Sequence, residues 1–200
     1  MSEEPRRPRR PMHFGPDAME AYGGTTPGPA ETAEAAHAAA LTVVQAGREG
    51  AGTTSERLVR LVDDVGLDTL AQLWSARPAR SLPGALWRLY IVREWVQRQP
   101  VEASRQYSAG MRSAEVSHVI AGIGEPPTAE QVRVLADRIL TGVFDGDLAV
   151  ALERCAAFCR VIATGRAELD DGDVVSAAAM LATAEDLEAS ATLWRAGSLH

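Results

Sequence analysis

Arginines gather just before the most apolar segment of the chain, and they are the residues best suited to binding chemistry. Arg77 and Arg80 belong to the segment ARPARS, Ser81 follows, and Arg88 lies within the apolar segment. A guanidinium group forms paired hydrogen bonds with carboxylate or phosphate, and the free N–H groups at the start of a helix favour anions. We therefore take Arg77, Arg80, Ser81 and Arg88 as the candidate site for an anion or an acidic partner. The alternative is structural: the arginines would pair with aspartate or glutamate elsewhere in the chain.

The chain has two cysteines, Cys155 and Cys159, spaced four apart on a predicted helix, so they share one face. A metal site needs about four ligands, and no CxxC motif or spaced histidine pair supplies the others. The spacing also orients two helical cysteines poorly for a disulfide. We expect buried core cysteines and predict neither a metal site nor a cofactor.

The four histidines, His13, His37, His118 and His200, form no HExxH motif. Two of them lie in segments that we expect to be flexible, and His118 is expected at the edge of an apolar helix face. The sequence also lacks a phosphate-binding glycine loop and a GxSxG nucleophile turn. No catalytic residue is predicted, and we expect that the protein is not an enzyme, although residues scattered along the sequence could still form an active site.

Two short acidic runs resemble oxygen-ligand sequences. They are Asp145–Asp147 and Asp170–Asp173. Neither has the alternating acids, central glycine and terminal glutamate of a calcium-binding loop. Both precede predicted helices, where a carboxylate accepts hydrogen bonds from backbone N–H groups and favours the helix dipole. We expect them to be helix caps.

Beyond position 30 the apolar residues recur with helical spacing, and these helices must position the arginines. Val132, Leu135 and Ile139 illustrate the spacing, and Thr128 with Gln131 fits a capping box before them. Glycine or proline interrupts the pattern every 12 to 20 residues or so. The sequence predicts an all-α protein, an irregular or orthogonal multi-helix bundle of seven to nine helices with a disordered N-terminal arm.

The segment 82–99 is apolar around most of its circumference, which is typical of a buried helix. We expect it to form the centre of the core, with Ser81 at its start. It carries Arg93 and Glu94, and burial of either charge requires a partner.

The domain organisation follows from composition. Residues 1–29 consist largely of proline, glycine and charged residues, with too few apolar side chains to offset the entropy cost of ordering. We expect a disordered arm over 1–29, one helical domain over 30–196 and a flexible C-terminus over 197–200. The arginines between Arg6 and Arg10 either solubilise the arm or contact an anionic partner transiently.

Charge is unevenly distributed in this chain of net charge −7, which has no lysine. Residues 113–200 hold six arginines and fourteen acids, a net charge of −8. This block is either a solvated acidic face or a surface for a basic partner. An acidic total argues against a general nucleic-acid binder. No secretory signal or membrane span is predicted, so we expect a cytoplasmic protein.

Two functions are therefore left open. The first is a non-enzymatic helical interaction protein, an adaptor or regulator that binds another protein through its acidic half or through a groove between helices. The alternative is an anion- or nucleic-acid-binding module that uses Arg77, Arg80 and Arg88 with the basic arm. The two differ in salt dependence, because contacts with nucleic-acid phosphates weaken steeply as salt rises.

Overall fold

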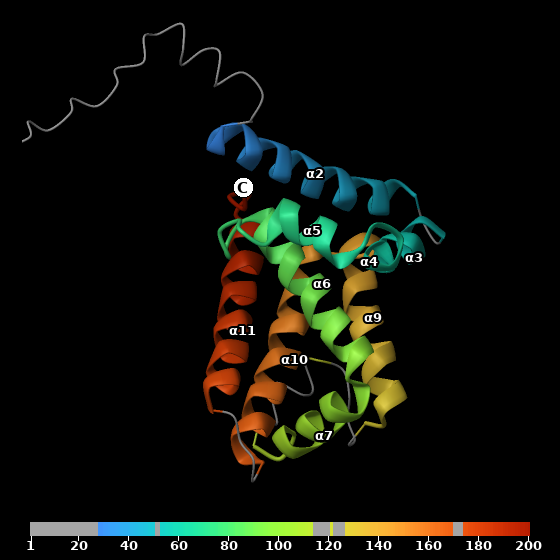
Figure 1. Ribbon diagram of the computed structural model, residues 1–200, viewed down its shortest axis with the longest axis vertical. Helices are drawn as coiled ribbons and strands as arrows, with labels where there is room; N and C mark the ends of the chain where they lie inside the picture. Colours follow the sequence, from blue (N-terminus) through green and yellow to red (C-terminus); the bar gives the residue numbers. More distant parts are fainter. Residues whose placement is uncertain (1–27, 51–52, 114–120, 122–126, 170–173) are drawn as a thin grey trace, which may run out of the picture. The chain divides into compact units, whose positions relative to one another are not determined.

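The computed structural model describes residues 28–50, 53–113, 121, 127–169 and 174–200 (Figure 1). Within these residues the chain forms nine α-helices and no strand, which confirms the predicted all-α fold. The helices are α2 (Pro29–Glu49), α3 (Thr53–Val59), α4 (Leu61–Val65), α5 (Leu67–Trp74), α6 (Leu82–Arg98), α7 (Pro100–Gly110), α9 (Ala129–Asp145), α10 (Leu148–Glu168) and α11 (Val174–Arg195).

The chain divides into two units, Met1–Thr32 and Ala33–His200. Of the first unit, only residues 28–32 are described, and they contain the first turn of α2, where the Thr32 N–H donates to the Gly28 carbonyl at 3.0 Å. The predicted arm therefore lies outside the described residues up to position 27. The sequence also predicts a short helix from Ser113 to Ile120, which lies largely outside the described residues, as do His118 and the Asp170–Asp173 run.

Local capping explains where several helices begin. The Ser81 hydroxyl accepts a hydrogen bond from the Gly84 N–H at 3.2 Å at the start of α6. Thr128 and Gln131 form both bonds of a capping box before α9, at 2.8 and 3.3 Å. Asp147 caps α10 by accepting from the Ala149 N–H at 2.8 Å. These three sequence predictions are confirmed, because a cap depends on residues within one turn of it.

Three helix boundaries differ from the expected ones. The helical spacing of Leu58, Leu61 and Val65 predicts one helix over 53–65, but it breaks at Arg60 into α3 and α4. Asp68 is a possible cap of the next helix by sequence. That helix instead begins at Leu67 after Gly66, whose φ of 84° favours glycine, and Asp68 lies in its first turn. Gly165 predicts the end of a third helix, but α10 continues through it to Glu168. That glycine instead allows a close helix crossing.

Helix α10 is the centre of the core, and α6 lies beside it. Among the described residues α10 packs against α6, α7, α9 and α11, and the four long helices α6, α9, α10 and α11 extend side by side above α7 in Figure 1. The expectation that 82–99 is central is thus only partly right, because Trp87, Ile91 and Trp95 of α6 are half-buried. Ile91 and Trp95 face the groove described below.

Buried polar groups in the core have hydrogen-bond partners, some of them far away in the sequence. Arg93, 6% exposed, donates from Nε to Asp137 at 2.7 Å, and Glu94, 9% exposed, accepts from Arg98 at 2.6 Å. The prediction that both charges are paired is confirmed. The Trp74 indole N–H donates to the Ala36 carbonyl at 3.2 Å and thereby ties α5 to α2.

The end of the chain also contacts the core. Leu199 is buried, and the Ser198 N–H donates to the Leu193 carbonyl at 2.9 Å. The expected domain limits stay predictions, but Leu199 belongs to the packed interior. None of the helices in the described part of the chain combines the length and apolarity needed to cross a membrane.

Candidate functional site

A groove of about 590 Å³ opens between α6 and α11, with residues from α7 and α10 completing its lining. In Figure 1 the two helices diverge toward α7, which crosses below them. The lining residues come from two parts of the chain, one around α6 and α7 and the other around α10 and α11. They are Ile91, Val92, Trp95, Gln99, Glu102, Arg105, Gln106, Arg166, Leu169, Ser176, Ala179, Met180 and Thr183.

The long walls of the groove are mainly apolar. On α6, Ile91 and Trp95 are one turn apart, so they share the same face. On α11, Ala179 and Met180 face them across the groove. The sequence predicts that Ile91 and Trp95 belong to the core, because the segment 82–99 is apolar around most of its circumference. The structure leaves them half-buried because α11 approaches α6 at one end only.

The polar side chains of the groove are bonded to one another. The Arg166 guanidinium lies over the Trp95 ring, 4.8 Å from its centroid, a favourable cation–π geometry. Arg166 also donates to Gln106 Oε1 at 2.7 Å and to Ser176 Oγ at 2.8 Å. One arginine of α10 therefore links α6, α7 and α11 and holds Trp95 at the edge of the groove.

A second polar cluster lies on α7. Glu102 accepts two hydrogen bonds from Arg105, each at 3.0 Å, and one from Gln106 at 2.6 Å. Because Gln106 also bonds Arg166, the clusters of α7 and α10 are continuous. The groove thus has apolar sides and one polar end in which the charges of opposite sign are mutually bonded.

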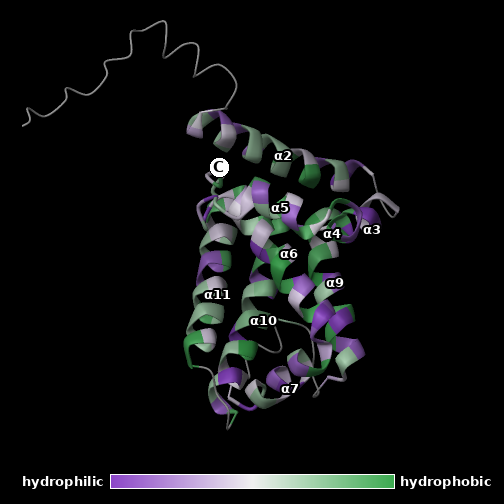
Figure 2. Ribbon diagram, in the orientation of Figure 1, coloured by the Kyte–Doolittle hydropathy of each residue, from purple (hydrophilic) through white to green (hydrophobic). Residues whose placement is uncertain are grey.

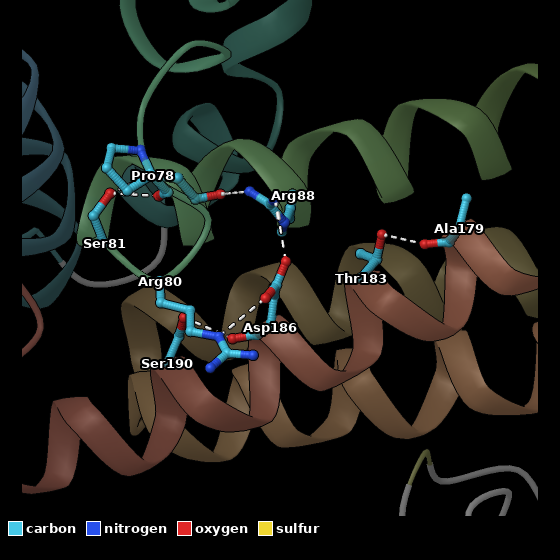
Figure 3. A network of polar contacts seen from close by, with 9 residues as sticks. Pro78, Arg80, Ser81, Arg88, Ala179, Thr183, Asp186 and Ser190 are labelled. Carbon is cyan, nitrogen blue, oxygen red and sulfur yellow. Dashed lines mark hydrogen bonds and ion pairs between the residues drawn. The ribbon is translucent and has the colours of Figure 1, made fainter.

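The predicted arginines lie at the other end of the groove, where they join α6 to α11 (Figure 3). Asp186 on α11 pairs with Arg80 at 3.1 Å and with Arg88 at 3.4 Å. Arg88 is one turn before Ile91 and Asp186 is one turn after Thr183, so the pair continues the two walls. The aspartate fixes the separation of α6 and α11 at this end.

Ser81 and Arg77 have different roles from the two paired arginines. Ser81 caps α6 and also donates from its hydroxyl to the Pro78 carbonyl at 2.8 Å. Arg77 has a buried Nε with no hydrogen-bond partner among the described residues. The structure therefore brings Arg80, Ser81 and Arg88 together around the start of α6, but it fills the space between the arginines with an internal carboxylate. Binding of an external anion there stays a prediction.

The sequence predicts neither the position of the groove nor the role of Asp186. Asp186 was one of fourteen acids in an acidic block, and nothing local marks it as the partner of residues 98 and 106 positions earlier. One signal was present in the sequence: residues 174–184 of α11, VVSAAAMLATA, contain no charge. Because this half of the helix has no charged residue on any side, apolar contacts are expected on more than the side that faces the core.

Other groups that could do chemistry lie in the interior. Cys155 and Cys159 are both buried and free, as predicted for core cysteines. The hydrogen bond between them and their burial raise the pKa of the Cys155 thiol, which keeps it in the less reactive protonated form. In the described parts of the chain, no three histidine, cysteine, aspartate or glutamate side chains gather where they could hold a metal ion.

The chain was compared with protein-family models, with curated proteins and with solved structures. No family model, curated protein or solved structure is significantly similar to this chain.

Proposed function

We propose that this chain is a non-enzymatic interaction protein that binds an amphipathic helix of another protein in the groove between α6 and α11. The observation that carries the proposal is the groove itself: about 590 Å³ between two helices with apolar walls. Helix-in-groove binding uses this geometry, in which the apolar face of a partner helix inserts side chains into a furrow. The volume is also within the usual range of ligand-binding cavities.

The side chains of the walls suit a protein partner. Trp95 is half-buried, and tryptophan is prominent among the residues that dominate the binding energy of protein interfaces. Met180 adapts its shape easily, since its side chain is unbranched and polarizable. Arg166 and Glu102 border the groove and are bonded to neighbouring side chains, which favours a role in shaping the surface over a role in proton transfer.

Two neighbouring residues of α11 provide a matched test. Met180 lines the groove, whereas Leu181 is 39% exposed and points away from it. Three baits, the native chain, Met180→Glu and Leu181→Glu, are used for affinity purification from the source organism with quantitative mass spectrometry. We expect a partner that the native chain and Leu181→Glu retain equally and that Met180→Glu retains at least tenfold less.

The baits must first have the same circular dichroism spectrum and melting temperature. Proteins retained equally by all three baits, or by none, would contradict groove binding. A partner lost only with Leu181→Glu would also contradict it, because that result places the interface on the opposite side of α11.

The alternative function, anion or nucleic-acid binding, has one observation in its favour. Arg77, three residues before Arg80 in the sequence, has a buried Nε with no acceptor among the described residues. Inorganic phosphate and a short DNA duplex are suitable probes, titrated at low and high salt. This alternative predicts salt-sensitive binding that Arg77→Ala weakens and that Asp186→Asn strengthens, since the internal carboxylate competes with the probe.

A further inference from the structure

Two histidines from distant parts of the sequence lie next to each other beside α2. The ring centroids of His37 and His200 are 6.4 Å apart, and the two ring planes are tilted by 59°. His37 belongs to α2 and is half-buried, whereas His200 follows α11 and is exposed. This separation is also ordinary for two aromatic rings in simple packing contact, so the surroundings of the two rings decide what the pair can do.

The position of His200 is set by the way α11 ends. Gly197 has a φ of 67°, its N–H donates to the Trp194 carbonyl at 3.0 Å, and the Ser198 N–H donates to the Leu193 carbonyl at 2.9 Å. These bonds form a Schellman motif, which ends the helix and turns the chain. The next residue, Leu199, is buried with 4% exposure. An anchored residue therefore directly precedes His200 and brings it to α2.

The position of His37 is set by the packing of α2. This helix turns small residues to the core, among them Ala36 and Ala40. The Ala36 carbonyl accepts a hydrogen bond from the Trp74 indole at 3.2 Å. His37 follows Ala36 directly, so the bond that ties α2 to α5 also fixes the place of this imidazole.

One nitrogen of the His37 ring is not used by the fold. Its Nδ1 atom is buried and has no hydrogen-bond partner among the described residues. Buried polar atoms are bonded in the great majority of cases, so an unbonded one is a sign of a further role. A neutral imidazole nitrogen without a proton is the form that binds a metal ion, and no donor of the fold occupies this one.

We propose that His37 and His200 together bind a divalent transition-metal ion, for which Zn²⁺ is the probe. Imidazole nitrogen is a preferred ligand of zinc, copper and nickel. Two imidazoles on one tetrahedral zinc, with metal–nitrogen bonds of about 2.0 Å, have ring centroids about 5 Å apart. The two rings must therefore approach by roughly 1 Å, and the exposed His200 ring has the freedom to make that movement.

The number of protein ligands sets the strength of this site. In the described parts of the chain, no three histidine, cysteine, aspartate or glutamate side chains gather where they could hold a metal ion. Water therefore completes the coordination. A structural zinc site has four protein ligands, so we expect weaker and reversible binding in the micromolar range. Neither histidine lines the groove, so this site is independent of the proposed function.

The bound ion would tie the end of the chain to α2. The buried residues of α2 are all small: Ala36, Ala40, Val44 and Gly47. A ligand that binds only the docked arrangement stabilises it. Zn²⁺ should therefore raise the melting temperature of the full chain and slow the hydrogen exchange of α2 amides.

Titration calorimetry of the full chain with Zn²⁺ tests the site, with Mg²⁺ as the comparison, because Mg²⁺ prefers oxygen ligands. We expect one zinc ion per chain and no binding of Mg²⁺. His37→Gln and His200→Gln should each weaken zinc binding at least tenfold. The control is the double variant His13→Gln with His118→Gln, which removes the other two histidines of the chain and should bind zinc as the native chain does.

The variants must first show the native circular dichroism spectrum, and the exposed His200 keeps the test decisive if His37→Gln does not fold. A native chain that binds no Zn²⁺ at about 1 mM overturns the proposal. Undiminished binding by His200→Gln overturns it as well. One zinc ion per two chains, with a doubled mass in sedimentation, would show that the ion bridges two copies, and this too contradicts a site within one chain.

Nuclear magnetic resonance of the full chain with ¹⁵N-labelled histidine identifies the ligands directly. Zn²⁺ should shift the ring nitrogen signals of His37 and His200, which the two single variants assign, and should leave those of His13 and His118 in place. Equal shifts of all four histidines would indicate unspecific binding and refute the site. Hydrogen exchange of α2 that zinc slows equally in the native chain and in His200→Gln would refute the link between the chain end and α2.

Discussion

The Asp186 carboxylate forms ion pairs with two arginines that are eight residues apart. The solvent exposure of each arginine determines how much its pair contributes to the stability of the fold. Arg80 is 58% exposed and its pair is weakened by solvent, whereas Arg88 and Asp186 are only 23% and 22% exposed. Arg88 also donates to the Gly84 carbonyl at 3.1 Å. The half-buried arginine is therefore the main partner, because removal of the carboxylate would leave it without an opposite charge.

Asp186→Asn tests this arrangement. We expect a loss of about 1 kcal/mol in the free energy of unfolding, at the upper end for partly exposed ion pairs, measured by urea denaturation. Glu130→Gln is the matched control, since Glu130 is 72% exposed in its pair with Arg133 and should cost less than about 0.5 kcal/mol. Equal losses in the two variants would show that the Asp186 pair does not tie α6 to α11.

Two buried tyrosines differ in whether the hydroxyl has a partner. Tyr90 donates to the Leu58 carbonyl at 2.7 Å, whereas the Tyr107 hydroxyl has no partner among the described residues. We expect Tyr90→Phe to lower the free energy of unfolding by about 1–2 kcal/mol. Tyr107→Phe should be neutral or stabilising, because the lost hydroxyl was desolvated without a bond. A larger loss for Tyr107→Phe, measured by chemical denaturation, would contradict this.

Burial of the Tyr107 phenol predicts that the free energy of unfolding depends on pH in the alkaline range. Burial raises the pKa of Tyr107 to about 12 from its ordinary value of 10.0. The folded state therefore holds the phenol proton more tightly than the unfolded state does. The resulting stability is fully present below pH 10 and is lost as the pH rises toward 12. Unfolding free energies measured between pH 9 and 11.5 should fall less steeply in Tyr107→Phe than in the native chain, and parallel curves would refute the assignment.

At the scale of elements, the crossing of α7 and α10 depends on two glycines. A Cβ atom on Gly165 would overlap the Gln106 carbonyl oxygen, and one on Gly110 would overlap the Val161 carbonyl oxygen. The two helices approach backbone to backbone, with no side chain between them. This contact positions Gln106 and Arg166, which form the polar end of the groove.

Alanine substitutions at glycine test how closely α7 and α10 pack against each other. Gly165→Ala should destabilise by about 1–3 kcal/mol, because the helices must separate. Gly142 on α9 is the matched control: its added Cβ would be 3.6 Å from Ala151 Cβ, an ordinary contact, so Gly142→Ala should stabilise by up to about 1 kcal/mol through helix propensity. Thermal and urea unfolding of the two variants measure the sign of each change in stability. A stabilising effect of Gly165→Ala would show that α7 and α10 are farther apart at their crossing than the structure indicates.

At the scale of the whole molecule, ion pairs join arginines of the first half of the chain to acids of the second half. Asp137 pairs with Arg93 and Asp186 with Arg80 and Arg88, so arginines from the first half reach acids of the second. Within the second half, Arg195 donates to Glu153, and this hydrogen bond lowers the pKa of the Glu153 carboxyl. Among the described residues of this block, these three acids are therefore paired with arginines.

Truncation tests where the folded unit begins. The first buried core residue in the described part of the chain is Ala36, and residues 1–27 are poor in apolar side chains. Deleting 1–27 should change the melting temperature by less than about 2 °C, whereas deleting 1–43 removes the carbonyl partner of Trp74 and should lower it by more than about 4 °C. Circular dichroism at 222 nm during heating measures both, and equal shifts would contradict the boundary.

The sequence by itself determined the helices, because the interactions that start a helix and give it an apolar face are local. Ser81, Thr128 with Gln131, and Asp147 act within one turn, and they were all identifiable from spacing alone. Helical periodicity likewise predicted that Cys155 and Cys159 are buried.

Only the tertiary structure decided which surfaces meet. Periodicity identifies an apolar face but not the neighbour that covers it, so Ile91 and Trp95 were assigned to the core and instead line a groove. The partner of Arg80 lies 106 residues away, and Gly165 marks a helix crossing where the sequence indicated a helix end. These features depend on how α6, α7, α10 and α11 pack together, and such long-range contacts leave no local pattern in the chain.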